Sequence, residues 1–256
     1  MRITTFLIVL VMLFLSTASV KSQSGTSSTN IYFSSSGETM FSWGKLDAGD
    51  ENINNIVRFS PVFNFGAQVH VDFNNTLGFY SGLDLRNVGL ISHTAEGYKI
   101  KERAYGLGLP IVIKIGDFSK NMNIGIGGEL EMMFAWKRKV IIPNFSKTKE
   151  LEWFSDNVNI FNPSLLAEIK FRQGFYIRYK YYLNDFLKYQ EGGLTIQIPT
   201  APYLKNIPDY AQSSQLMYIS CGFMISDKTI DGMAPGKSGY SKAEDGYFPD
   251  VAARNP

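Results

Sequence analysis

The stretch Met122–Trp136, MNIGIGGELEMMFAW, decides the fold. Every second residue from Met122 is apolar or glycine, whereas the positions between them include Asn123, Glu129 and Glu131. A period of two residues is the period of a β-strand whose two faces meet different surroundings. A strand of about 15 residues is much longer than the 5 or 6 that are usual in a soluble sheet. The pattern therefore predicts a wall with lipid on one side and packed polar groups on the other.

The composition of the 256-residue chain narrows the function classes. The length suits one large all-β unit or two small domains, and 45% hydrophobic residues exclude a disordered chain. A net charge of +2 gives no basic footprint for a nucleic acid. The single cysteine, Cys221, excludes an intramolecular disulfide framework, and the chain has only two histidines. We therefore expect no nucleic-acid partner, no metal site and no cofactor.

The two ends of the chain are predicted not to belong to the folded barrel. Residues 1–23 combine Arg2, the apolar run Phe6–Leu15 and a small polar stretch, which is the order of a secretory signal peptide. No later stretch reaches about 18 apolar residues, so any membrane crossing has to be made by strands. Residues 227–256 are rich in Gly, Pro, Lys and Asp, and we expect a flexible, polar periplasmic tail there.

Residues 24–226 carry the predicted barrel. Eight segments alternate in the manner of Met122–Trp136, and their connections alternate between long and short. This sorting is typical of an all-β, eight-stranded, antiparallel up-and-down barrel of the bacterial outer membrane. The predicted strands are Ile31–Gly44, Phe59–Asp72, Leu77–Ile91, Ile100–Ile115, Met122–Trp136, Asn159–Phe171, Phe175–Leu183 and Ser214–Ile225. The predicted long connections are Asp47–Asn55, Ser92–Lys99, Lys137–Asn157 and Lys188–Ser213.

The inward-facing parity collects four acids and four bases. A barrel of eight strands is only wide enough to be filled by side chains, so these groups are expected to pair in a plugged, charge-balanced lumen. The predicted structural ion-pair network is Asp84, Arg86, Glu129, Glu131, Glu168, Lys170, Arg178 and Lys180. The outward-facing parity carries aromatic residues that are expected to form girdles at the membrane boundaries, namely Phe41, Trp43, Tyr105, Phe134, Trp136 and Phe175.

Catalytic readings of the same residues are weaker. His70 with Asp84 or Glu129 resembles the acid–base pair of a lipid hydrolase, but no serine motif supplies a nucleophile, which favours a structural lumen histidine. The cations of Lys137–Lys139 follow Trp136 directly, where they would contact anionic headgroups or belong to a solvated loop. We therefore expect no catalytic residue. A soluble barrel that binds a lipophilic ligand would need the reverse parity, with charges outside.

One family resemblance accompanies this pattern. Leu77–Ile91, LGFYSGLDLRNVGLI, followed by Glu102–Gly116, ERAYGLGLPIVIKIG, resembles the PorT-like outer-membrane β-barrel proteins of Bacteroidota. The resemblance is clearest over residues 56–136, weaker up to Ile225, and does not cover the tail. It implies an architecture rather than an activity and supplies no catalytic residues. PorT itself is linked to type IX secretion and gliding.

These observations predict a non-enzymatic outer-membrane barrel. It would be a structural or accessory component of an envelope or secretion complex of the type IX kind, in contact with outer-membrane lipid. It would dock other envelope proteins through Lys137–Asn157, Lys188–Ser213 and the tail. The alternatives are a lipid-modifying barrel enzyme and a soluble lipophile-binding barrel.

Overall fold

The computed structural model of the 256-residue chain describes residues 29–49, 53–95, 97–143, 147–197 and 204–226. The predicted signal peptide and C-terminal tail lie outside the described residues. The described chain is almost entirely β-structure and contains no helix of the length and apolarity that a membrane crossing requires. Its strands are β1 (Asn30–Asp47), β2 (Ile53–Ile56), β3 (Arg58–Ser60), β4 (Phe65–Asp72), β5 (Leu77–Thr94), β6 (Lys99–Asp117), β7 (Met122–Ile141), β8 (Lys147–Trp153), β9 (Phe161–Lys170), β10 (Phe175–Tyr182), β11 (Leu194–Gln197), β12 (Leu204–Ile207) and β13 (Ser213–Ser226).

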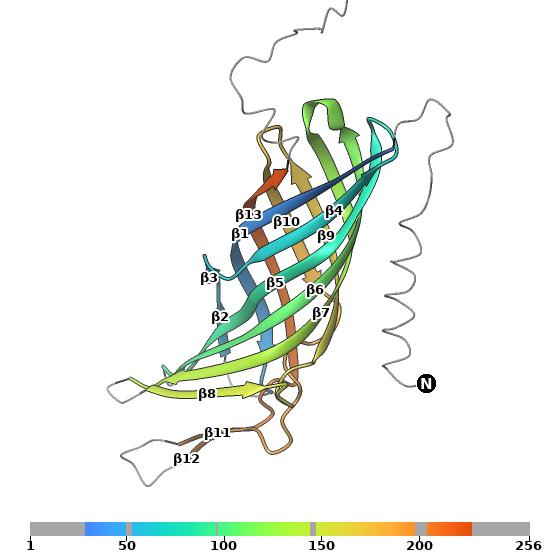
Figure 1. The fold of residues 1–256 in the computed structure, drawn as a ribbon. Helices are drawn as coiled ribbons and strands as arrows, with labels where there is room; N and C mark the ends of the chain where they lie inside the picture. The colour runs from blue at the N-terminus through green and yellow to red at the C-terminus, as the bar shows by residue number, and fades with distance from the viewer. Residues whose placement is uncertain (1–28, 50–52, 96, 144–146, 198–203, 227–256) are drawn as a thin grey trace, which may run out of the picture.

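Eight of these strands form a closed antiparallel ring (Figure 1). The order around the ring is β1, β4, β5, β6, β7, β9, β10 and β13, and β13 pairs again with β1 from Ser34↔Ser226 to Asp47↔Ser213. Closure leaves no unpaired sheet edge in the wall, which is what a strand structure in hydrocarbon needs. The structure confirms the predicted eight-stranded antiparallel barrel.

The outer surface of the ring is apolar and the interior is charged. Ile111, Ile126 and Leu165 are 60%, 66% and 56% exposed, whereas Glu131 and Arg178 are buried at 0% and 1%. A soluble barrel could not leave such a band in water, because contiguous apolar patches of this kind are rare on soluble monomers. A soluble lipophile-binding barrel would need apolar residues inside and charged residues outside, and the structure has the opposite arrangement.

The second predicted strand, Phe59–Asp72, is interrupted. β3 ends at Ser60 and β4 begins at Phe65, because Pro61 has no N–H to donate and Phe63 has a left-handed backbone with φ of 64°. Asn64 fixes the break: its side-chain amide donates to the carbonyl of Ser60 at 3.1 Å and accepts from the backbone N–H of Asn87 at 2.9 Å.

The long connections contain strands that the sequence patterns did not predict. Within Lys137–Asn157, β7 continues to Ile141 and pairs with β8. Within Lys188–Ser213, β11 and β12 form a hairpin, and part of Asp47–Asn55 forms β2, which pairs with β5. Figure 1 shows β5, β6, β7 and β8 projecting together from one end of the barrel. We call this end the long-loop end and the opposite end the short-turn end.

A β-bulge on β7 reverses which residues face the lumen. Tyr105 of β6 lies opposite Ala135 whereas Gly106 lies opposite Met133, so Phe134 is the extra residue. One extra residue moves every later side chain of the strand to the other face. The prediction that Trp136 belongs to the outer aromatic girdle is therefore wrong: Trp136 is fully buried inside. Arg138 points inward for the same reason, so only Lys137 and Lys139 of the Lys137–Lys139 cluster face outward.

Candidate functional site in the barrel lumen

The eight predicted lumen residues are all buried, on the inward faces of β5, β7, β9 and β10. Arg86 pairs with Asp84, and its Nε lies 3.6 Å from Glu129 Oε1 and 3.7 Å from Glu131 Oε1. Lys180 pairs with both Glu129, at 3.0 Å, and Glu131. These contacts join side chains from three strands into one cluster at the centre of the lumen.

Arg178 extends the cluster to β9. Its Nη2 donates to Glu168 Oε2 at 2.9 Å and to the Tyr80 hydroxyl at 3.3 Å, and its Nη1 lies 3.9 Å from Asp84 Oδ2. The guanidinium also lies 5.0 Å from the centroid of the Tyr176 ring. Lys170 lies on the same inward face of β9, one step nearer the short-turn end, in register with Asn123 and Tyr176.

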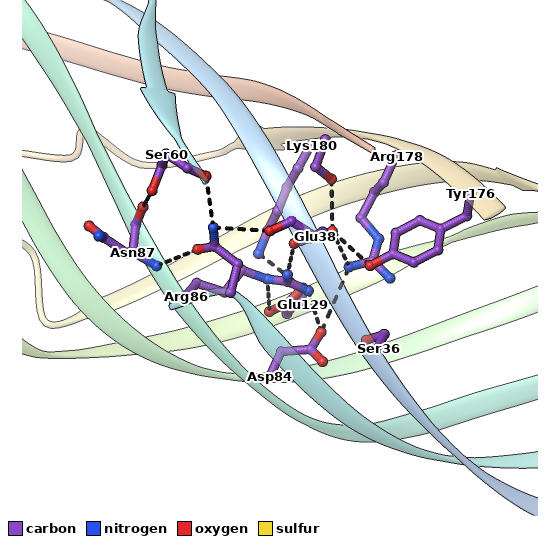
Figure 2. Close-up of polar contacts among 12 residues, drawn as sticks. Ser36, Glu38, Ser60, Asp84, Arg86, Asn87, Glu129, Tyr176, Arg178 and Lys180 are labelled. Atoms are coloured by element: carbon purple, nitrogen blue, oxygen red, sulfur yellow. Dashed lines mark hydrogen bonds and ion pairs between the residues drawn. The ribbon is translucent and has the colours of Figure 1, made fainter. Parts of the chain in front are cut away.

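Glu38 of β1 is a central member of this network that the sequence analysis missed (Figure 2). It pairs with Arg86, and its Oε2 lies 3.4 Å from Arg178 Nη1. The same oxygen accepts from the Tyr176 hydroxyl at 3.0 Å and from Ser220 Oγ at 2.8 Å. Glu38 and Met40 are two residues apart and therefore share the inward face of the first strand, which could have identified Glu38 as a lumen residue. The serines and Gly37 around it weaken the alternation that would have made this visible.

Glu38 changes the charge balance of the central cluster. The connected cluster contains five carboxylates (Glu38, Asp84, Glu129, Glu131 and Glu168) and three bases (Arg86, Arg178 and Lys180). With Lys170 added there are five acids and four bases, in place of the predicted four and four, whereas the buried charged residues of the described chain as a whole are seven acids and seven bases. Each base therefore serves several carboxylates at once, and the bases are the residues whose loss the network tolerates least.

Two inward glycines make room for these side chains. A Cβ built on Gly108 would overlap Glu129 Oε1, and one built on Gly125 would lie 2.7 Å from Glu168 Cγ. Real Cβ contacts are longer than this, so neither position accepts a larger residue without displacing a carboxylate. The interior is therefore packed around the ion pairs.

A second polar cluster lies toward the short-turn end. Lys114 Nζ donates to Asp72 Oδ1 at 2.6 Å and lies 3.1 Å from His70 Nδ1. His70 Nε2 lies 2.7 Å from Ser34 Oγ, and the Tyr32 ring stacks on the imidazole with centroids 4.7 Å apart. His70 thus lies beside Ser34 and Lys114. Its predicted partners, Asp84 and Glu129, lie in the central cluster instead.

The hydrogen bonds of His70 run in the wrong direction for a hydrolase. An ammonium group only donates, so Nδ1 accepts from Lys114 and the neutral imidazole carries its proton on Nε2. Nε2 then donates to Ser34 Oγ, and Ser34 donates to Gln68 Oε1 at 3.2 Å. A general base has to accept the proton of the nucleophile. The arrangement satisfies buried polar groups and does not activate Ser34.

The long-loop end of the lumen is filled by a third cluster. Arg138 Nε donates to Glu102 Oε1 at 2.6 Å, and the Tyr210 hydroxyl donates to the same oxygen at 3.1 Å. The Arg138 guanidinium lies 4.7 Å from the Trp136 ring centroid. Apolar residues from β11, β12 and the barrel wall pack around it, namely Leu194, Ile196, Ile207, Val88, Leu90, Ile100 and Val140. Among the described residues there is no group of His, Cys, Asp and Glu that could hold a metal ion.

Comparisons with known proteins give a likeness of shape only. Neither the protein-family models nor the curated proteins give a match. Among solved structures, the attachment invasion locus protein Ail of Yersinia pestis has a TM-score of 0.32 and 13% identity, over 76% of this chain and 98% of Ail. Neisserial surface protein A has a TM-score of 0.32 and 11% identity, over 77% of this chain and 98% of its own. No functional argument follows from likeness at this level.

Proposed function

We propose that this protein is a non-enzymatic outer-membrane barrel with a closed lumen, acting as a structural or accessory component of an envelope complex. The observation that carries the proposal is the filled interior: five carboxylates and three bases pair across the centre, and Trp136, Arg138 and Tyr210 occupy the long-loop end. An eight-stranded ring packed in this way leaves side chains, and no aqueous channel, between its two ends.

The surfaces available to a partner lie at the long-loop end. β8 stands outside the ring and pairs only with β7 among the described strands, and its Leu151 and Trp153 are 55% and 67% exposed. Tyr189, which follows β10, is also exposed. These residues fall in Lys137–Asn157 and Lys188–Ser213, the two connections expected to dock other envelope proteins. With the asymmetry of outer-membrane barrels, this end would face the outside of the cell.

The resemblance of residues 56–136 to the PorT-like group directs the proposal further, toward a secretion complex of the type IX kind. Support for this step comes from the sequence segments Leu77–Ile91 and Glu102–Gly116, which form most of β5 and β6. In this proposal the barrel provides a fixed, lipid-embedded support and the partner provides the activity.

Affinity purification from native membranes in mild detergent tests the docking role. The full chain is compared with L151D/Y189D, which places two carboxylates on the exposed long-loop surfaces, and with S119D, a control on an exposed residue of the short-turn end. We expect proteins that copurify with wild type and S119D to be lost from L151D/Y189D. Identical sets for all three would contradict docking through this end. Ion conductance in planar bilayers would contradict the closed lumen.

The contact between Ser34 and His70 motivates one test of the enzymatic alternative. A lipid-modifying enzyme that used this pair would lose its activity in S34A. We expect wild type and S34A to release equally little fatty acid from phospholipid vesicles, because Nε2 of His70 donates to Ser34. Hydrolysis by wild type that S34A abolishes would replace the proposed function with an enzymatic one.

A further inference from the structure

The outward face of β6, β7 and β8 carries three rungs of cations beyond the barrel wall. Two rungs run straight across the three strands: Arg103, Lys137 and Leu151 in the first, and Lys101, Lys139 and Lys149 in the second. The third rung has Lys99 and Lys147 on either side of Ile141. We call these seven cations the basic face: Lys99, Lys101, Arg103, Lys137, Lys139, Lys147 and Lys149.

The basic face has no acidic partner in the described part of the chain. None of its members lies within 4.0 Å of a carboxylate among the ion pairs there, and Glu150 and Glu152 of β8 point to the opposite face, where Glu150 approaches Arg138 at 3.5 Å. Desolvation and then the neighbouring Lys147, Lys149, Arg103 and Lys137 lower the pKa of Lys139. Like charges directly opposite each other destabilise a sheet, so a bound anion would relieve a real repulsion.

An aromatic rung fixes the height of the basic face relative to the membrane. In the next rung toward the barrel, Tyr105 and Trp153 lie on either side of Ala135. The ring of the bulge residue Phe134 lies between theirs, with centroids 6.5 Å and 6.0 Å apart. Such rings mark the level at which hydrocarbon gives way to headgroups in transmembrane barrels. The cations begin at the very next rung, with Arg103 and Lys137.

We propose that the basic face binds the phosphate groups of a phosphorylated glycolipid in the outer leaflet. Strands lie about 4.8 Å apart and residues of one face repeat about every 6.7 Å along a strand, so the seven cations cover about 10 Å by 13 Å. That area accommodates more than one phosphate, each in reach of two or three donors. Ammonium and guanidinium groups make short, charge-assisted hydrogen bonds to phosphate oxygens.

The position of the face favours a lipid over a soluble polyanion. Acyl chains would lie on the apolar wall below the aromatic rung, where Leu107 and Leu130 are exposed, while the headgroup reached Arg103 and Lys137. A soluble anion would use the cations alone. The inference rests on the proposed orientation, with the long-loop end outside the cell, and not on the docking role. Leu151 belongs to both surfaces, so L151D/Y189D also adds a carboxylate to the first rung, whereas the lysine variants below leave Leu151 and Tyr189 unchanged.

The experiment measures lipid retention by the full chain folded in a neutral detergent, with diphosphoryl lipid A as the probe. The variant K101Q/K139Q/K149Q removes the central rung. The matched control K45Q/K120Q/K188Q removes the same number of charges, with Lys120 in the Phe118–Lys120 turn at the short-turn end. A second variant, K147Q/K149Q, changes only β8, which lies outside the eight-stranded ring, so the barrel folds regardless.

We expect wild type to retain the lipid and the central-rung variant to bind it at least about tenfold more weakly, with the control within about twofold of wild type. The K147Q/K149Q variant should be intermediate, and added lipid should raise the melting temperature of wild type more than that of either variant. Equal binding by wild type and both variants would overturn the proposal. So would equal retention of dephosphorylated lipid, or displacement of the lipid by millimolar inorganic phosphate or by heparin.

Discussion

Removing Arg86 should destabilise the barrel far more than removing Glu38, although the two side chains pair with each other. Without Arg86, the five carboxylates of the central cluster keep only Arg178 and Lys180 as bases. Losing one partner of a buried ion pair typically costs 3–5 kcal/mol, and Arg86 serves four carboxylates, so we expect about 4 to 5 kcal/mol for R86M.

The E38Q variant keeps the hydrogen bonds from Tyr176 and Ser220 and removes one negative charge of the central cluster, together with its ion pair to Arg86. A glutamine at position 38 can still accept from the Tyr176 and Ser220 hydroxyls, so we expect a loss of only about 1 kcal/mol. In the double variant E38Q/R86M one uncompensated carboxylate is gone, and we expect it to recover about 1–3 kcal/mol of the R86M loss, a coupling energy usual for residues in contact.

The assay is reversible urea unfolding of the full chain in lipid vesicles, followed by tryptophan fluorescence and by the heat-dependent shift in gel mobility. K120M, in an exposed turn where the Lys120 side chain is 68% exposed, controls for a loss of positive charge and should change stability by less than about 0.5 kcal/mol. A cost for E38Q as large as that for R86M, or no recovery in the double variant, would refute the charge count of the central cluster.

Three further predictions follow from other parts of the structure. G108A should cost about 1–3 kcal/mol because the new methyl group meets Glu129, whereas G37A, whose Cβ would lie 4.0 Å from the Phe65 ring, should be nearly neutral in the same unfolding assay. Y210A should cost about 3 kcal/mol by opening a cavity at the long-loop end, and Y210F about 1.5 kcal/mol by removing the bond to Glu102; no cost for Y210F would contradict the hydrogen bond, and equal costs would contradict the packing of the ring. Hydrogen bonds from Ser119 and Lys120 lower the pKa of Asp117 to about 2, so its stabilising contribution is present above its ordinary pKa of 3.8 and is lost as the pH falls through 2. Carboxyl NMR should show the pKa rising toward 3.8 in S119A, and an unchanged pKa would contradict the role of Ser119.

The barrel could be predicted because the alternation of apolar and polar residues is visible within each strand segment taken by itself. A strand between hydrocarbon and a packed polar interior has to alternate apolar and polar residues. Met122–Trp136 does so up to the bulge at Phe134. The same alternation placed seven charged residues in one connected cluster. The predicted envelope partners, signal peptide and tail stay predictions.

The misses come from features that alternation alone does not encode. The bulge at Phe134 depends on how β7 pairs with β6, and it puts Trp136 on the face opposite to the one predicted. The sequence of β8, KTKELEW, reads as a polar loop, because outside the membrane neither face needs to be apolar. Glu38 was missed because small polar neighbours dilute the pattern of β1.

The most direct test of the account uses two adjacent leucines of β9 in the unaltered chain. Leu165 faces outward and is 56% exposed, whereas Leu166 is buried in the lumen with Tyr80 and Val112, so the two differ in facing and not in chemistry. With methyl-labelled leucine and spin-labelled lipid in the bilayer, NMR should show strong paramagnetic broadening of the Leu165 methyl signals and little broadening of those of Leu166. Equal broadening, or stronger broadening at Leu166, would contradict the claim that this parity of the barrel meets lipid.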